Sequence, residues 1–222
     1  MSDARNGTTT LIERLCAFDS ATLYQAAGNR GAMAPGIHSL TPGRRVAGPA
    51  LTVVCPPGDN LMLHAAVAEA RPGAVLVAQV NAAGYGVWGE VLSVAAMARG
   101  IVALVIDGSV RDIDSIQELG FPVFAQGTAL QTADKRDLGC IGVPISCGGQ
   151  LVWPADYVVA DDSGIVVIPR EAVEQTLAAA AARVAKETAI MESLRQGQTT
   201  MDLLELRPIL ARSTEERERA LS

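Results

Sequence analysis

Histidine and aromatic residues are scarce in this sequence of 222 residues. It contains two histidines, His38 and His64, and aromatic residues make up 4% of the chain. A zinc site with several imidazole ligands is therefore almost excluded, and any metal should be bound by oxygen atoms. The four cysteines form no CxxC pair, so we expect buried, reduced thiols in place of a thiolate metal site or a disulfide framework.

Positive charge and long apolar runs are also lacking. Lys and Arg number 18 against 24 for Asp and Glu, the net charge is −6, and no five-residue basic block occurs. A nucleic-acid or membrane partner is therefore not expected. No apolar run reaches about 18 residues, the length of a spanning helix, and the N-terminal stretch has no apolar signal-peptide core. We expect a cytoplasmic location.

Residues 84–124 contain the most informative pattern in the sequence, because the hydrophobic period changes twice within them. The pattern predicts a glycine-rich turn, a helix, a buried parallel strand, a second turn and the start of another helix. These elements are expected at 84–89, 91–98, 101–106, 107–108 and from 111 onward. Ligands of open α/β sheets bind where strands end and helices begin, so we expect the active site here.

The flanking segments predict an α/β fold. Helices are expected at 10–18, 20–28 and 59–70, and strands at 45–55 and 74–80. Short, mostly antiparallel strands should follow at 143–145, 151–153, 157–159 and 165–168. An Ala-rich helix over 171–195 could pack on its own sheet or on a neighbouring subunit. We divide the chain into a catalytic domain, 1–169, and a C-terminal helical extension, 170–222, packing at a subunit interface.

The predicted turn and the Arg111-Asp112 pair are the main candidates for chemistry. Glycines before a helix let the N–H groups of Glu90, Val91 and Leu92 approach a carboxylate, although an ordinary turn would give the same pattern. The spacing is not GxGxxG, which disfavours a dinucleotide fold. Arg111 offers a planar fork for a carboxylate and Asp112 an oxygen ligand for Mg²⁺; the alternative is a surface ion pair.

Two other polar motifs have simpler interpretations. His64, on the helix after Gly58, is more typical of a satisfied structural histidine than of a catalytic one. Asp161-Asp162 resembles a pair of catalytic carboxylates, but the sequence Asp-Asp-Ser-Gly is also typical of a turn between strands. We interpret it as a turn.

Five segments, taken together, match a known family. They are GDNLMLHAAVAEARPGAVLV, YGVWGE, ARGIVALVIDGSVRD, LGFPVFAQG and VVADDSGIVVIP, in this order between residues 15 and 200. With them the chain resembles the RraA-like superfamily, and within it the 4-hydroxy-4-methyl-2-oxoglutarate / 4-carboxy-4-hydroxy-2-oxoadipate aldolase branch. The resemblance implies a β/β/α swivelling-type sandwich with a central mixed sheet, assembled as a homotrimer or homohexamer with sites between subunits. It also implies a lyase, a class II pyruvate aldolase with Mg²⁺ (or Mn²⁺), a 2-oxo diacid substrate and oxaloacetate decarboxylase side activity.

The resemblance also assigns roles to particular residues. An acidic residue followed by Arg-Asp maps onto Glu90, Arg111 and Asp112, which would be catalytic. The backbone from Gly89 to Leu92 would hold the substrate's carboxylate together with Arg111, and Asp112 would bind the metal. Glu187, from the C-terminal helix of a neighbouring subunit, is a candidate for orienting water at that site.

One position departs from the family pattern, and one rival function exists. The family has an acid three residues after the Arg-Asp aspartate, where this chain has Ser115; Asp114 lies about 100° away around the helix and does not replace it. The rival is the non-enzymatic branch, which binds and inhibits ribonuclease E. Its members typically lack the aspartate and the long C-terminal helix, so Asp112 favours the enzyme. A related lyase or decarboxylase of another 2-keto acid is a third alternative.

Overall fold

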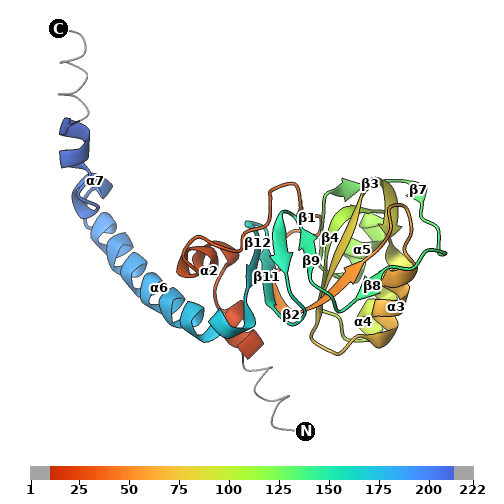
Figure 1. Ribbon diagram of the computed structural model, residues 1–222. Helices are drawn as coiled ribbons and strands as arrows, with labels where there is room; N and C mark the ends of the chain where they lie inside the picture. Colours follow the sequence, from red (N-terminus) through yellow and green to blue (C-terminus); the bar gives the residue numbers. More distant parts are fainter. Residues whose placement is uncertain (1–10, 213–222) are drawn as a thin grey trace. The chain divides into compact units, whose positions relative to one another are not determined.

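The computed structural model describes residues 11–212, which divide into two compact units at Ala180/Ala181. The first unit is built on a ten-stranded mixed sheet whose main path has the order β1-β5-β4-β3-β2-β11-β12 (Figure 1). These strands are β1 His38–Ser39, β5 Val123–Ala125, β4 Ala103–Val110, β3 Val75–Trp88, β2 Val46–Val54, β11 Tyr157–Asp161 and β12 Gly164–Ile168. Short strands β6 (Gly127–Thr128), β7 (Gln131–Thr132) and β8 (Cys140–Ile141) pair with β4, β3 and β2.

The centre of the sheet is parallel. Strands β2, β3, β4 and β5 run in the same direction, and the helices α3, α4 and α5 lie between them in the chain and on one side of the sheet (Figure 1). The helices span Leu61–Glu69, Glu90–Ala98 and Ile113–Leu119. Parallel strands buried on both faces need continuous apolar runs, and the sequence supplies them in β3 and β4.

Successive side chains of β3 and β4 enter two different cores, as the two-residue period of a strand requires. Leu76, Leu104 and Ile106 pack under the helices. Val77 and Val105 face the opposite side, where the hairpin of β9 (Ile145–Cys147) and β10 (Gln150–Val152) covers them. The sheet is thus the middle layer of a sandwich, which confirms the predicted fold class.

The antiparallel end of the sheet has a third core. β11 pairs with β2 and β12, and helical residues 11–16 and α2 (Ser20–Ala26) pack there through Leu15 and Leu23. Asp19 caps α2 as predicted, accepting a hydrogen bond from the Thr22 N–H at 2.6 Å.

A long C-terminal helix follows β12. A short 3₁₀ helix, η1 (Arg170–Ala172), leads into α6 (Val173–Arg195), whose first turns bury Val173, Leu177 and Ala180 in the third core. The second unit contains the rest of α6, α7 (Thr200–Leu203) and helical residues 207–212. Among residues 11–212, no helix combines the length and the apolar composition needed to cross a membrane.

Candidate active site

The predicted glycine-rich turn at 84–89 is wrong for most of its length. β3 continues to Trp88 with irregular register against β4, so that Gly86 pairs with Ser109 and Trp88 with Val110. β4 likewise continues through the predicted turn at Asp107-Gly108. The two strands therefore end side by side, and Gly89 and Arg111 immediately follow them.

The Asp112 carboxylate approaches the backbone of Gly89 closely. A Cβ at position 89 would lie 2.4 Å from Asp112 Oδ2. The same oxygen accepts a hydrogen bond from the Glu90 N–H at 3.3 Å. Gly89 is the N-cap of α4, and the N–H groups of Val91 and Leu92 have no acceptor among the described residues. Asp112 thus lies at the positive end of a helix whose free donors can bind a second anion.

A backbone hydrogen bond fixes Arg111 beside the ends of β3 and β4. Its N–H donates to the Trp88 carbonyl at 2.8 Å, and a Cβ at Gly86 would meet the Ala129 carbonyl oxygen at 2.3 Å and Arg111 Cβ at 3.1 Å. The Arg111 Nε lies 3.4 Å from Asp112 Oδ2, with 42% and 39% of the two side chains exposed. This loose contact leaves most of the guanidinium free to bind a ligand.

Asp112 has a backbone conformation that is uncommon for aspartate. It is the N-cap of α5, with φ 57° and ψ 36°, in the left-handed region, and its side chain does not cap α5. The carboxylate instead turns toward Gly89 and Glu90. Among residues other than glycine, aspartate is one of those that adopt the left-handed region most readily.

A cavity of about 210 Å³ brings the candidate residues together. The predicted residues that line it are Gly89, Val91, Leu92, Arg111 and Asp112. The other lining residues are Asn60, His64, Gly86, Val87, Trp88, Thr132, Ala133 and Lys135. Sequence reasoning missed Asn60 and Lys135, and treated His64 as structural. The only signal was the position of Asn60 and His64 one helical turn apart on one face of a helix.

Asn60 and His64 form the α3 wall of the cavity. Asn60 is 7% exposed, and its Nδ2 donates to the Val87 carbonyl at 2.7 Å. Within residues 11–212, its Oδ1 and the His64 Nε2 are buried without a hydrogen-bond partner. Burial lowers the pKa of His64, and the nearby Lys135 charge lowers it further. The imidazole is therefore neutral at pH 7, so Lys135 is the cation on this side.

The buried Trp88 side chain forms the floor of the cavity. Trp88 is 1% exposed and stacks on Phe121 with ring centroids 6.1 Å apart. Its indole N–H donates to Ser93 Oγ at 2.8 Å, and that hydroxyl donates to the Gly89 carbonyl at 3.1 Å. Trp88 is thereby linked to the start of α4, and packing fixes the position of the helix terminus.

Three predicted residues lie outside the cavity lining. Glu90 is exposed beside it, and only its N–H contacts Asp112. Ser115, on α5, does not line the cavity either. Glu187 belongs to the second unit, where its carboxylate pairs with Arg183 at 2.5 Å. Its placement at a neighbouring subunit's site stays a prediction.

The donors present are compatible with Mg²⁺ held largely by substrate and water. No group of three or more His, Cys, Asp or Glu side chains within residues 11–212 could enclose a metal. Mg²⁺, however, commonly uses only one or two carboxylates and keeps several waters. The Asp112 carboxylate has only long contacts, at 3.3 and 3.4 Å, so its lone pairs remain available.

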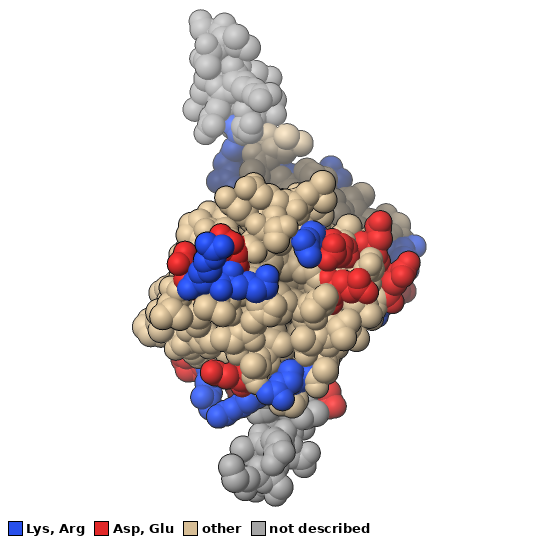
Figure 2. Space-filling model, turned by 90° about the vertical axis from the view of Figure 1, so that its right-hand side faces the viewer, with Lys and Arg blue, Asp and Glu red and all other residues tan. Residues whose placement is uncertain are grey.

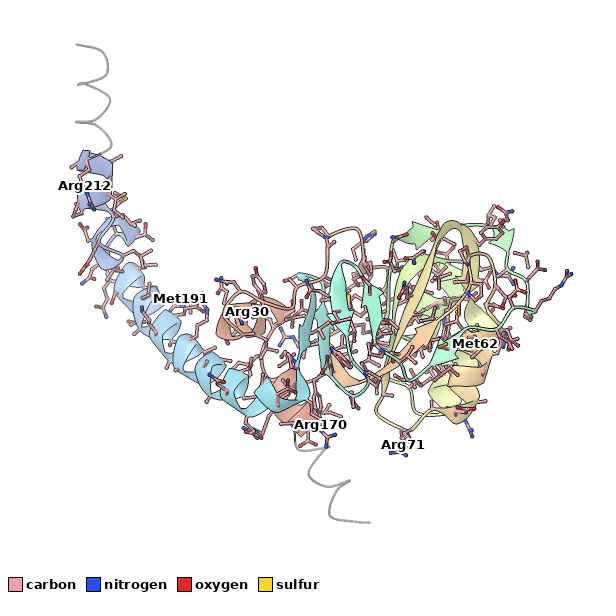
Figure 3. All side chains as sticks on the ribbon, viewed as in Figure 1. Arg30, Met62, Arg71, Arg170, Met191 and Arg212 are labelled. Carbon is pink, nitrogen blue, oxygen red and sulfur yellow. The ribbon has the colours of Figure 1, made fainter. Side chains whose placement is uncertain are left out.

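A larger cavity, of about 940 Å³, lies elsewhere in the first unit. Arg30 and Arg170, both labelled in Figure 3, line it together with Trp153 and Asp156. None of the predicted site residues lines it. Met62, also labelled in Figure 3, belongs instead to α3, the helix that forms one wall of the smaller cavity. The candidate chemistry is therefore confined to the smaller cavity.

The charges around the candidate site are local. Figure 2 shows the side of the molecule that lies on the right in Figure 1, where α3, α4 and β7 are drawn. Charged side chains gather there in a few clusters, of which the largest is mostly acidic, on a largely uncharged surface. A small anion would thus be bound by individual groups such as Arg111 and Lys135, and not by a broad basic field.

Known proteins are similar to this chain in fold and in sequence. The family model described as RraA-like, Aldolase/RraA, matches residues 3–167. A protein of Halalkalibacterium halodurans named "Putative 4-hydroxy-4-methyl-2-oxoglutarate aldolase" is 38% identical over 156 residues, covering 69% of this chain and 73% of the relative. An uncharacterized protein from Pseudomonas syringae pv. tomato has a similar structure, with a TM-score of 0.76 and 30% identity over 86% of this chain and 94% of the other.

A second similar structure has a different description. Streptomyces coelicolor RraAS2, described as an unusual member of the RNase ES inhibitor RraA protein family, has a TM-score of 0.70 and 30% identity over 85% of this chain and 96% of the other.

The mixed-sheet sandwich with a cavity at adjacent strand ends places this chain in the α/β class. The match over residues 3–167 then shows that it belongs to the RraA-like (aldolase/RraA) family. The predicted family is thereby confirmed.

Proposed function

We propose that the protein is a divalent-metal-dependent class II pyruvate aldolase. It would cleave 4-hydroxy-4-methyl-2-oxoglutarate or 4-carboxy-4-hydroxy-2-oxoadipate to pyruvate and a second 2-oxo acid. The observation that supports this most is the convergence of Arg111, Asp112 and the unpaired Val91 and Leu92 N–H groups on one cavity. The name of the Halalkalibacterium halodurans relative points to the same substrate.

In this proposal the protein binds the substrate by its 2-oxo acid end. The carboxylate accepts hydrogen bonds from the Val91 and Leu92 N–H groups and from the Arg111 fork. Asp112 would hold Mg²⁺ (or Mn²⁺), and a bound metal would supply stabilisation of the negative charge that develops on the 2-oxo oxygen as the C–C bond breaks. The same stabilisation would serve loss of CO₂ from oxaloacetate, so we expect decarboxylation as a side activity.

The remaining groups act on the other parts of the substrate. Lys135 faces the distal carboxylate, for which an ammonium group is the natural partner. Glu90 orients water beside the cavity, and Glu187 would do so from a neighbouring subunit in a homotrimer or homohexamer. That water would take the proton of the substrate hydroxyl and return one to the carbon released by C–C cleavage, which thereby becomes the methyl group of pyruvate.

The test is a coupled assay of pyruvate formation with and without Mg²⁺. Asp112→Asn should reduce kcat/KM by about 10²-fold or more, because the neutral amide is a poor ligand for a hard cation. Asp114→Asn is the matched control, because Asp114 is an exposed residue of α5, the helix that Asp112 precedes, and this variant should be active. Full turnover after chelation would exclude the metal mechanism, and no pyruvate from either diacid would exclude the aldolase.

The similarity to RraAS2 supports a second candidate, a non-enzymatic regulator of ribonuclease E. Such a protein would bind the nuclease and release no pyruvate in the same assay. Turnover of a different 2-keto acid in a substrate panel would instead identify a related lyase or decarboxylase.

A further inference from the structure

Asp59 is a buried carboxylate just before α3, and it is 2% exposed. Within the described residues it forms no ion pair with Lys, Arg or His. Instead it accepts three backbone hydrogen bonds. Oδ1 accepts from the Leu61 N–H at 2.8 Å, while Oδ2 accepts from the Arg136 and Asp137 N–H groups at 2.7 and 3.1 Å. One side chain therefore joins α3 to a loop more than seventy residues further along the chain.

Backbone hydrogen bonds fasten the same two segments next to this side chain. The Asp134 N–H donates to the Gly58 carbonyl at 2.8 Å, and the Asn60 N–H donates to the Asp134 carbonyl at 3.0 Å. Burial would raise the pKa of Asp59, but the N–H groups of Leu61, Arg136 and Asp137, together with the nearby Lys135 charge, outweigh it and lower that pKa. Asp59 is therefore ionised at neutral pH, when it binds these donors most strongly.

Lys135 lies between the fastened residues. Residues 134–138 are all exposed, so the loop has little apolar packing of its own to fix its course. Lys135 nevertheless lines the cavity together with Arg111 and His64, and its charge acts on His64. Asp134 and Arg136, the neighbours of Lys135 in the chain, are both hydrogen-bonded to residues 58–60. Residues 58–60 therefore determine where the Lys135 ammonium group can reach.

We propose that Asp59 is a positioning residue that fixes Lys135 over the cavity, and that Lys135 selects ligands with a second, distal carboxylate. The inference rests on the proposed function, because the 2-oxo acid end must bind to Arg111 for the distal carboxylate to reach Lys135. Asp59 itself does not line the cavity and acts only through the loop.

Binding of two ligands tests this without relying on turnover. Pyruvate has only the 2-oxo acid end, and 2-oxoglutarate adds a distal carboxylate but has no hydroxyl for aldol cleavage. Calorimetry in the presence of Mg²⁺ gives the ratio of their dissociation constants. Lys135→Gln should reduce the preference for 2-oxoglutarate by about 10- to 100-fold, as expected for loss of a hydrogen bond between charged groups. Pyruvate affinity should change by less than about threefold.

Asp59→Asn should reduce the same preference, because an amide has a single acceptor oxygen and cannot accept both from the Leu61 N–H and from the N–H groups of Arg136 and Asp137. In the Lys135→Gln background, Asp59→Asn should not change the ligand preference further, because Asp59 is proposed to act only through Lys135. Asp156→Asn is the matched control: that carboxylate is also buried and accepts backbone N–H groups, from Trp153 at 3.0 Å and Arg170 at 3.3 Å, but it lines the other cavity. It should leave the preference unchanged.

An unchanged preference in Lys135→Gln, additive effects in the double variant, or an equal change in Asp156→Asn would each overturn the proposal. Asp137→Pro provides a second variant if Asp59→Asn does not fold. It removes one N–H donor from an exposed loop position and should lower the preference partly; wild-type preference would contradict the role of Asp59. Normal ligand preference without pyruvate release from the hydroxy diacids would instead count against the aldolase and leave this assignment in place.

Discussion

Gly89→Ala is expected to reduce the activity of this protein strongly while leaving its stability nearly unchanged. The added Cβ would lie 2.4 Å from Asp112 Oδ2 and 3.2 Å from Arg111 Cγ. A carbon and an oxygen do not approach so closely without repulsion, so the carboxylate must move by roughly 1 Å. A displacement of that size in a catalytic group can cost about 10²-fold in rate. We therefore expect kcat/KM for pyruvate release to fall by that factor.

The fold should tolerate the same substitution. Gly89 has φ −160° and ψ −166°, extended backbone that alanine also adopts, and the nearest obstacle is the mobile end of a side chain. Loss of the 3.3 Å hydrogen bond from the Glu90 N–H costs about 1 kcal/mol, and the stiffer unfolded chain offsets part of it.

The assay is metal-dependent pyruvate formation, with the midpoint of thermal unfolding measured on the same samples. Gly84→Ala is the matched control, because no heavy atom lies within 4 Å of a Cβ there, and it should behave as wild type. Near-wild-type turnover of Gly89→Ala would refute the close packing of Asp112 against this backbone as a requirement for activity. A large loss of stability would refute the expected tolerance of the fold.

Two further predictions concern charged groups in the cavity. Arg111→Lys keeps the charge but loses the planar fork, so kcat/KM should fall by about 10², whereas wild-type kinetics would rule out the substrate-binding role proposed for Arg111. Lys135→Gln should raise the pKa of His64, because one cause of its depression is removed. In wild type the His64 pKa is lower in the folded than in the unfolded state, so the free energy of unfolding falls as the pH drops from about 6.5 to the folded-state pKa. Because the variant has a smaller difference between the two pKa values, its free energy of unfolding should fall less over this range. Titration of the imidazole by NMR measures the shift, and an unchanged pKa would contradict the proximity of Lys135.

Local sequence patterns predicted the elements that local interactions determine. The helix beginning at Glu90, the cap at Asp19 and the buried strand within β4 all follow from period and capping. The end of β3 did not, because residues 82–88 are held by pairing with β4 and β7, which the sequence does not reveal. Glycines at 84 and 86 weaken any strand signal further.

The candidate site was also predictable only in part, because some of its residues are brought together by local interactions and others by long-range ones. Arg111, Asp112 and the backbone after Gly89 are near one another in sequence or follow adjacent strands, so their convergence could be expected. Lys135 lies in a polar segment without periodicity, and that segment is brought to the cavity by long-range hydrogen bonds, some to the Asp59 carboxylate and some between the backbones of residues 58–60 and Asp134. A buried aspartate with backbone partners cannot be distinguished by sequence from an ordinary residue before a helix.

The left-handed conformation of Asp112 has an evolutionary consequence. Glycine adopts φ 57° without the steric cost that an L-residue incurs, which is up to about 1–2 kcal/mol and smaller for aspartate. Glycine also makes the unfolded chain more flexible, which offsets part of that gain. If Asp112 has the proposed metal-binding role, a descendant that no longer needed the carboxylate could replace it at little cost in stability, which offers a simple route from an enzyme to a binding protein with the same architecture.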